Sequence, residues 1–135
     1  MYARILVPTD GSGAATRGVR EAIALAKALH SRLVLLHAID DFPITNGLVE
    51  GGRDILDAAA RLAQAEGMDC ETVLRELDVG HAADAILAEA REKACNLIVM
   101  GTHGRRCVNR ALLGSVSEKV LRRSPVPVML VREPG

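Results

Sequence analysis

The sequence predicts an α/β protein built on a parallel sheet of five strands. Short apolar runs alternate along the chain with amphipathic segments of helical period, which is the order of βαβ units. The apolar runs 33–39 and 97–100 are almost continuous in aliphatic residues, as expected of strands buried on both faces. The 135 residues are 49% hydrophobic and are enough to bury one core. We therefore expect residues 1–135 to form a single domain.

The first half of the chain predicts two strands and two helices. Residues 4–7 form a short apolar strand, and the glycine-containing stretch 8–13 that follows predicts a loop. The next helix buries residues at helical spacing, namely Val19, Ala22, Ile23, Ala26 and Leu29. Residues 33–39 form the second strand, and Pro43 and the glycines of 40–52 predict a loop. A second amphipathic helix, ended by Gly67, buries Ile55, Leu56, Ala59, Leu62 and Ala63.

The second half predicts three further strands and two helices. Residues 70–77 alternate weakly, which indicates a strand near a sheet edge, and residues 78–81 form a turn. The third helix buries Ala83, Ile86, Leu87, Ala90 and Ala94. A buried strand at 97–100 and a fourth helix at 115–123 follow, and this helix is expected to turn Val116, Val120 and Leu121 inward. The last strand covers 126–131, and Pro127 within it indicates an edge position.

Two loops of this topology fall at the same edge of the sheet. Ligands of open parallel sheets bind beyond the carboxyl ends of the strands, where the strand order reverses. The loops 8–13 and 101–114 follow the first and the fourth strand. They form one crevice if those two strands are neighbours, an arrangement that the sequence pattern leaves as one option among several.

The loop after the fourth strand has the composition of a phosphate site. Gly101 and Gly104 open it, Arg105, Arg106 and Arg110 lie within it, and Gly114 closes it. Glycines let main-chain N–H groups approach an anion, and the helix that follows adds its positive N-terminal end. Ser115 and Glu118 have the spacing of a capping box with Ser115 as the N-cap. The alternative is that the glycines only turn the chain and the serine only caps the helix.

The spacing Gly101-x-x-Gly104, nine residues, then Gly114-Ser115 resembles the nucleotide-binding signature of the universal stress protein family, in its ATP-binding branch. The resemblance covers nearly the whole chain. Residues 5–12 resemble the opening strand and loop of the family, residues 96–101 its fourth strand and residues 124–131 its closing strand. It implies a flavodoxin-like, adenine nucleotide alpha hydrolase-like sheet of order 3-2-1-4-5, with helices on both faces.

The resemblance also implies which residues bind the nucleotide. Pro8, Thr9, Asp10 and Ala38 would contact the adenine and ribose. The phosphates and ribose would be surrounded by Gly101, His103, Gly104, Gly114, Ser115 and Val116, with Met100 nearby and Ser117 completing the set. From spacing alone, a ribose contact and a loop cap are equally good interpretations of Asp10.

We expect the other histidines and the cysteines to have structural rather than chemical roles. We expect His103 to contribute mainly its main-chain N–H, although a histidine there suits a phosphate donor or a general acid. His37, in a buried strand, is expected to pack, and Cys107 to be an inert small side chain. Three scattered cysteines, Cys70, Cys95 and Cys107, do not fit a disulfide framework or a zinc site.

The expected function is binding rather than catalysis. The sequence contains no Walker A lysine motif, nucleophile elbow, catalytic dyad or paired metal ligands. We predict an ATP-binding regulatory module of the stress response, in which Mg²⁺ accompanies the triphosphate and an unidentified protein is the partner. One alternative is a slow ATPase or nucleotidyl transferase at the same site. The other is an interaction module that does not use a nucleotide.

The net charge of the chain and the composition of its last strand predict which other partners it has. A formal net charge of zero argues against nucleic acid and anionic membranes as partners. No apolar run reaches spanning length and the first strand begins at Arg4, so we expect a cytoplasmic protein. Residues Val126 to Val131 are too apolar for an exposed edge, which predicts a homodimer joined through this strand. The alternative is a monomer whose edge is blunted by residues 132–134.

Overall fold

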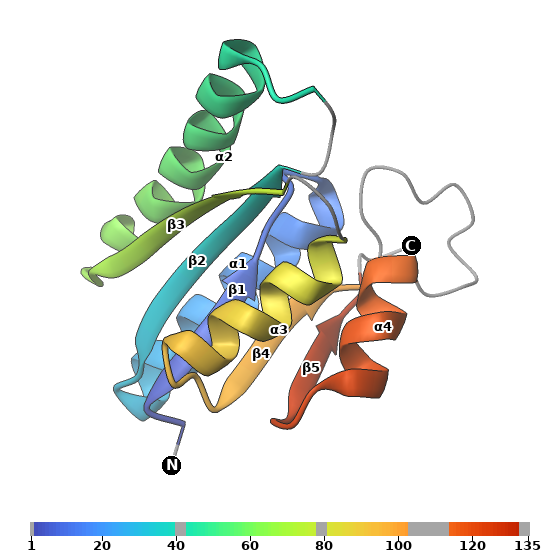
Figure 1. Cartoon of the computed structure of the whole chain (residues 1–135). Helices are drawn as coiled ribbons and strands as arrows, with labels where there is room; N and C mark the ends of the chain where they lie inside the picture. The colour runs from blue at the N-terminus through green and yellow to red at the C-terminus, as the bar shows by residue number, and fades with distance from the viewer. Residues whose placement is uncertain (1, 40–42, 78–80, 103–113, 133–135) are drawn as a thin grey trace.

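The computed structural model describes residues 2–39, 43–77, 81–102 and 114–132. One sheet in the order β3-β2-β1-β4-β5 runs through the molecule (Figure 1). All four ladders are parallel. The strands are β1 (Arg4–Pro8), β2 (Arg32–Ile39), β3 (Cys70–Glu76), β4 (Leu97–Gly101) and β5 (Val128–Val131). The predicted fold class and strand order are confirmed, including the pairing of the first strand with the fourth.

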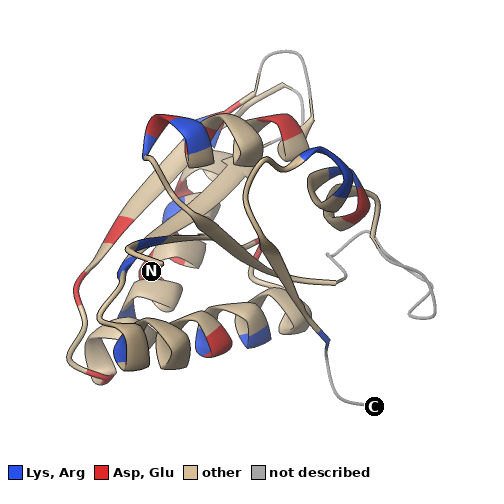
Figure 2. Ribbon diagram, turned by 90° about the horizontal axis from the view of Figure 1, so that it is seen from below, with Lys and Arg blue, Asp and Glu red and all other residues tan. Residues whose placement is uncertain are grey.

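Four helices sandwich this sheet (Figure 2). On one face lie α1 (Gly13–Leu29) and α2 (Asn46–Ala65), and on the other α3 (Ala82–Glu92) and α4 (Ser115–Arg123). The helices on the two faces bury the central strands from both sides. Ile5 and Val7 of β1 join the core under α1 and α2, whereas Leu6 joins the core under α3 and α4. This alternation explains why the strand sequences are continuously apolar.

Charged residues fall mostly on the helices, and the central strands carry few of them (Figure 2). Between α3 and α4, Lys119 Nζ lies 3.3 Å from Asp84 Oδ2, and Arg123 lies 3.8 Å from Asp84 Oδ1. The hydrogen bond from Lys119 lowers the pKa of Asp84. Asp84 and Arg123 are exposed and Lys119 is partly exposed, so these pairs contribute little to stability.

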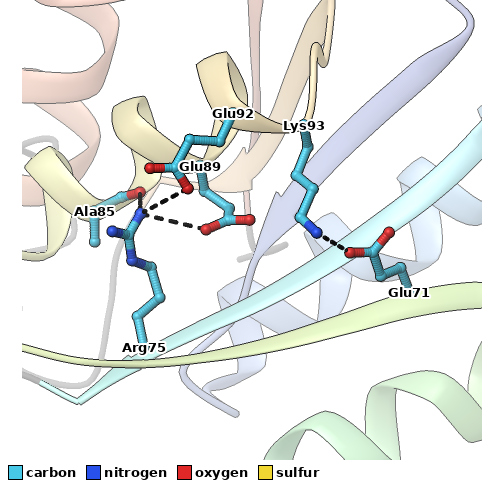
Figure 3. A network of polar contacts seen from close by, with 6 residues as sticks. All are labelled: Glu71, Arg75, Ala85, Glu89, Glu92 and Lys93. Atoms are coloured by element: carbon cyan, nitrogen blue, oxygen red, sulfur yellow. Dashed lines mark hydrogen bonds and ion pairs between the residues drawn. The ribbon is translucent and has the colours of Figure 1, made fainter.

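A polar network attaches the edge strand β3 to α3 (Figure 3). Arg75 Nη1 lies 3.3 Å from Glu89 Oε1, 3.4 Å from the Ala85 carbonyl oxygen and 3.9 Å from Glu92 Oε2. The Glu89 side chain is only 4% exposed, so Arg75 pairs a buried carboxylate that would be costly to leave alone. Lys93 and Glu71 form a second ion pair between the same regions.

One helix start and one helix cap differ from the prediction. Helix α2 begins at Asn46, inside the predicted loop 40–52, because Thr45 is its N-cap and accepts the Leu48 N–H at 3.2 Å. The capping box at Ser115 is wrong. The N-cap of α4 is Gly114, and Ser115 is the exposed first helical residue. In both places the glycines had been interpreted as loop residues, although a helix accepts glycine where packing or a cap favours it.

Four smaller corrections concern inward-facing residues and the ends of elements. Leu121 is 47% exposed, and Ser117 takes the buried place on α4. Leu29, at the end of α1, is 43% exposed. Helix α3 ends at Glu92, so Ala94 lies beyond it with a positive φ of 53°. Strand β5 starts at Val128, so Pro127 precedes it, and the edge position is confirmed.

Within the described ranges, no helix has both the length and the apolar character needed to cross a membrane. The predicted turn at 78–81 falls mainly on residues outside those ranges.

Candidate functional site

The candidate site lies at the carboxyl ends of β1 and β4, which are neighbours in the sheet (Figure 1). The strand order reverses between these two strands, since β1 continues to β2 on its other side. Helices α1 and α4 both begin at this edge. Helix α1 starts at Gly13, five residues beyond Pro8, and α4 starts at Ser115, 14 residues beyond Gly101. Each helix N-terminus carries about half a positive charge. Two positive helix ends therefore lie at the edge of the sheet where the strand order reverses.

The first loop is a closed turn built on Thr9. The Thr9 N–H donates to the Leu36 carbonyl at 2.8 Å, and Thr9 Oγ1 accepts the Gly11 N–H at 3.2 Å. Asp10 Oδ1 accepts the Ser12 N–H at 2.9 Å, and Ser12 Oγ caps α1 by accepting the Ala15 N–H at 3.2 Å. Gly11 has φ 79°, which suits glycine. Asp10 thus fills the loop-cap role, and its contact with a ribose stays a prediction.

Gly101 is required by helix packing, whether or not a ligand is present. A Cβ atom at this position would lie 2.6 Å from the carbonyl carbon and oxygen of Ala14 in α1. On the helix side, a Cβ at Gly18 would lie 3.1 Å from the Gly101 nitrogen and 3.2 Å from the Met100 carbonyl carbon. Backbone therefore packs on backbone where α1 crosses the end of β4, and the crossing fixes the first loop beside the fourth strand.

A buried hydrogen-bond cluster fixes the start of α4. Ser117 Oγ lies 2.9 Å from the Gly101 carbonyl oxygen and 3.1 Å from that of Thr102. The Thr102 carbonyl also accepts the Gly114 N–H at 2.8 Å, and the Thr102 N–H donates to the Val131 carbonyl at 3.1 Å. Ser117 and Thr102 are 4% and 3% exposed. The hydroxyl of Ser117 thus holds the helix to β4, a role that the sequence did not reveal.

The N-terminus of α4 has no side-chain cap among the described residues. Its N-cap, Gly114, has φ −64° and ψ 151°, and the Glu118 N–H donates to the Gly114 carbonyl at 3.0 Å. Ser115 is exposed. The main-chain amides of a first helical turn have no intrahelical acceptors, and a helix start of this kind is a ready anion site.

The other predicted site residues fall into three groups. Ala38 and Val116 are half-buried, on β2 and α4 respectively. Met100 is 5% exposed and packs in the core under α3 and α4. His103, Gly104, the three loop arginines and Cys107 lie outside the described residues.

Sequence reasoning missed one residue of the first loop's surroundings. His37 Nδ1 lies 2.8 Å from the Thr9 carbonyl oxygen, so this half-buried histidine does more than pack. The available signal was its position beside Ala38 at the carboxyl end of a strand.

The described residues do not combine into a metal cluster. No group of three or more His, Cys, Asp and Glu side chains among them is placed to hold a metal ion. Burial raises the pKa values of the Cys70 and Cys95 thiols, which keeps both protonated and weakly nucleophilic. The main-chain amides at the start of α4 and the polar groups of the first loop are groups that can recognise anions and hydroxyl groups.

Comparison with known proteins yields one family. The model of the universal stress protein family matches residues 1–132. A universal stress protein of Thermus aquaticus is 39% identical over 138 residues, which cover 98% of this chain and 100% of that protein. The solved structure of protein MJ0577 of Methanocaldococcus jannaschii superposes with a TM-score of 0.88 at 27% identity, covering 100% of this chain and 99% of that one. A universal stress protein solved in complex with cAMP has a TM-score of 0.79 at 32% identity, covering 98% of each chain.

The glycine contact at the end of β4 generates a stability prediction. Gly101→Ala should lower the free energy of unfolding by about 3 kcal/mol, because the new methyl group meets main-chain atoms that cannot rotate away. Chemical denaturation followed by circular dichroism measures the change. The matched control is Gly51→Ala in α2, where a Cβ meets nothing within 4 Å. This control should stabilise the protein by about 0.5–1 kcal/mol. Equal effects of the two variants would show that the close approach is absent.

Proposed function

The chain belongs to the universal stress protein family, and we propose that it is a single-domain, adenine nucleotide-binding module that regulates a protein partner in the stress response. One observation carries the proposal: α1 and α4 both begin at the carboxyl ends of the paired strands β1 and β4, and α4 has no side-chain cap among the described residues. A relative that is 32% identical was solved in complex with cAMP, which supports an adenine nucleotide as the ligand.

The start of α4 is the proposed phosphate site. The phosphates would receive hydrogen bonds from main-chain amides of Gly114, Ser115, Val116 and Ser117, with the positive end of the helix beneath them. The family signature adds His103 and Gly104 from the loop before the helix. Because Ser117 Oγ and Thr102 hold this helix end to β4, the amides are positioned before a ligand arrives.

The adenine and ribose are proposed to lie over Pro8, Thr9, Asp10 and Ala38, near Met100 and Gly101. The Leu36 carbonyl accepts the Thr9 N–H, so the main-chain polar groups of Leu36 point toward β1. Main-chain direction repeats every second residue in a strand, which turns the polar groups of Ala38 toward the first loop. A carboxylate offers about four acceptor positions, so Asp10 can hold its turn and still accept a ribose hydroxyl.

ATP is the proposed resident nucleotide, with Mg²⁺ held mainly by phosphate oxygens and water. Magnesium commonly binds in this way, through substrate phosphates and one or two carboxylates. Asp10 is the acidic candidate of the first loop.

The proposed mechanism is a population shift. A nucleotide that bridges the first loop and α4 favours one placement of these segments. The Gly114 N–H donates to the Thr102 carbonyl, and the Thr102 N–H donates to the Val131 carbonyl. Two hydrogen bonds therefore connect the proposed phosphate site to β5. Occupancy of the site would therefore bias the surface around β5 that a partner meets.

We also propose a homodimer joined through the final strand. Strand β5 is a sheet edge, and Met129 on it is 37% exposed. An apolar edge of unpaired main-chain groups is a template for pairing, and antiparallel pairing about a two-fold axis closes the assembly. Val126 to Val131 would contribute the contact.

A charge placed at the start of α4 tests the phosphate site. Ser115→Asp should weaken ATP binding at least tenfold, because the new carboxylate repels the phosphates by about 1.4 kcal/mol or more. The same change should not destabilise the fold, because a carboxylate in the first turn suits the helix dipole. Isothermal titration calorimetry measures the affinity and a thermal melt the stability. Ser115→Asn is the neutral control and should bind within about twofold of the unchanged protein. If the aspartate variant binds ATP as well as the control, the phosphates lie elsewhere.

Nucleotide binding should stabilise the protein without rapid turnover. ATP at about 100 times its dissociation constant should add about 2.7 kcal/mol to the folded state. This corresponds to a melting rise of roughly 7–15 °C for a domain of this size. Phosphate release should stay below about one per minute, far under the usual enzyme range. Tripolyphosphate is the control for the adenosine part and should stabilise less. Rapid multiple turnover would instead identify the site as that of an ATPase.

A lysine on the β5 edge tests the dimer. Met129→Lys should convert a dimer to a folded monomer, because the two lysines face each other near the two-fold axis. Met129 is chosen because Val131, on the same strand, packs against the core under α1 and α2. Multi-angle light scattering at micromolar concentration measures the mass. The control Leu121→Lys changes an exposed residue of α4 and should leave the dimer intact. A wild-type protein that is already monomeric contradicts the interface.

A further inference from the structure

We infer that His37 is a positioning residue of the nucleotide site, which sets the orientation of the Thr9–Asp10 peptide through a hydrogen bond from its Nδ1 atom. This inference rests on the proposed function for its consequence, the effect on nucleotide affinity. The positioning itself concerns the protein without a ligand. The hydrogen bond of His37 is to Thr9, so the role inferred for it is indirect.

The imidazole of His37 takes the place of a main-chain donor at the end of the β1–β2 ladder. Strands β1 and β2 pair as far as Pro8 and Leu36, and the next N–H, that of Thr9, still donates to the Leu36 carbonyl. In a continued parallel ladder, the Thr9 carbonyl would accept a main-chain N–H from β2. Here it lies 2.8 Å from His37 Nδ1. A carbonyl oxygen only accepts, so Nδ1 must carry the hydrogen.

This hydrogen bond determines where the next amide points. The peptide between Thr9 and Asp10 is planar, so its N–H points opposite to its carbonyl. The carbonyl points toward β2, and the Asp10 N–H therefore points toward the β4 side of β1, where the proposed site lies. The turn that follows, with Asp10 bonded to Ser12 and Ser12 capping α1, inherits this orientation.

The ring has little freedom to leave its position. A Cβ atom at Gly52 of α2 would lie 2.9 Å from His37 Cδ2 and 2.7 Å from Leu74 Cδ1. The absence of a side chain at Gly52 therefore makes the room that the ring and Leu74 occupy. Thr9 is only 6% exposed, so water cannot readily replace the imidazole as a donor to its carbonyl. Both facts favour a dedicated role over general packing.

Two substitutions separate the donor from the bulk of the side chain. His37→Asn places an amide nitrogen near the position of Nδ1, whereas His37→Leu keeps an apolar side chain of moderate size and no donor. Calorimetric titration with ATP should show His37→Leu binding about fivefold to tenfold more weakly, the effect of one lost hydrogen bond. His37→Asn should bind within about twofold of the unchanged protein. Equal affinity of the leucine variant and the unchanged protein would overturn the inference.

A readout without ligand keeps this test separate from the proposed function. In the free protein, ¹⁵N spectra should show His37 protonated at Nδ1, and exchange of the Ser12 amide should be faster in His37→Leu and restored in His37→Asn. If the unchanged protein fails to bind ATP, the proposed function falls, while exchange still decides the inference. A neutral ring protonated at Nε2, or unchanged Ser12 exchange in the leucine variant, overturns it. If His37→Leu does not fold, His37→Val, which also lacks a donor and suits a strand, takes its place with the same expectations.

Discussion

The contact between the end of β4 and the first turn of α1 is the constraint on which the rest of the structure depends. Gly101 and Gly18 allow main-chain atoms to approach to a distance that any side chain would prevent. Because α1 begins directly after the first loop, this approach places that loop beside the fourth strand. Helix packing thus sets the first loop next to Gly101, where the second predicted loop begins. Glycine at position 101 belongs to the scaffold, and its place in a nucleotide signature has a structural cause.

Buried polar groups carry that constraint outward in two directions. Toward α4, Ser117 and Thr102 bind the helix start to β4 and, through Val131, to the edge strand β5. Toward β2, Thr9 binds Leu36 through its N–H and His37 through its carbonyl. A made hydrogen bond adds little net stability, but leaving one of its buried partners unpaired is costly. Both groups of hydrogen bonds therefore hold these segments in one arrangement. A ligand at the switch point would contact segments held by both.

Sequence reasoning succeeded where one signal had one structural cause. Aliphatic runs predicted the strands, and Val19, Ala22 and Ile23 predicted the buried face of α1, because burial alone selects these residues. It failed where a residue type serves two causes. Glycines at 47, 51 and 52 indicated a loop but lie within α2, and Ser115 with Glu118 indicated a capping box but follows a glycine N-cap. Leu121 was expected inward, yet the inward place belongs to the hydroxyl of Ser117.

By itself, the sequence determined the class of fold, the number and order of its elements, and the two loops that carry the candidate site. These follow from hydrophobic period and from glycine and proline positions, which act over a few residues. Only the tertiary structure decided that His37 reaches Thr9, that Ser117 bonds two successive carbonyls at the end of β4, and that Arg75 pairs the buried Glu89. The partners in these contacts are 28, 16, 15 and 14 residues apart. A hydrogen bond depends on the distance between two atoms in space, and no local pattern of residues encodes that distance.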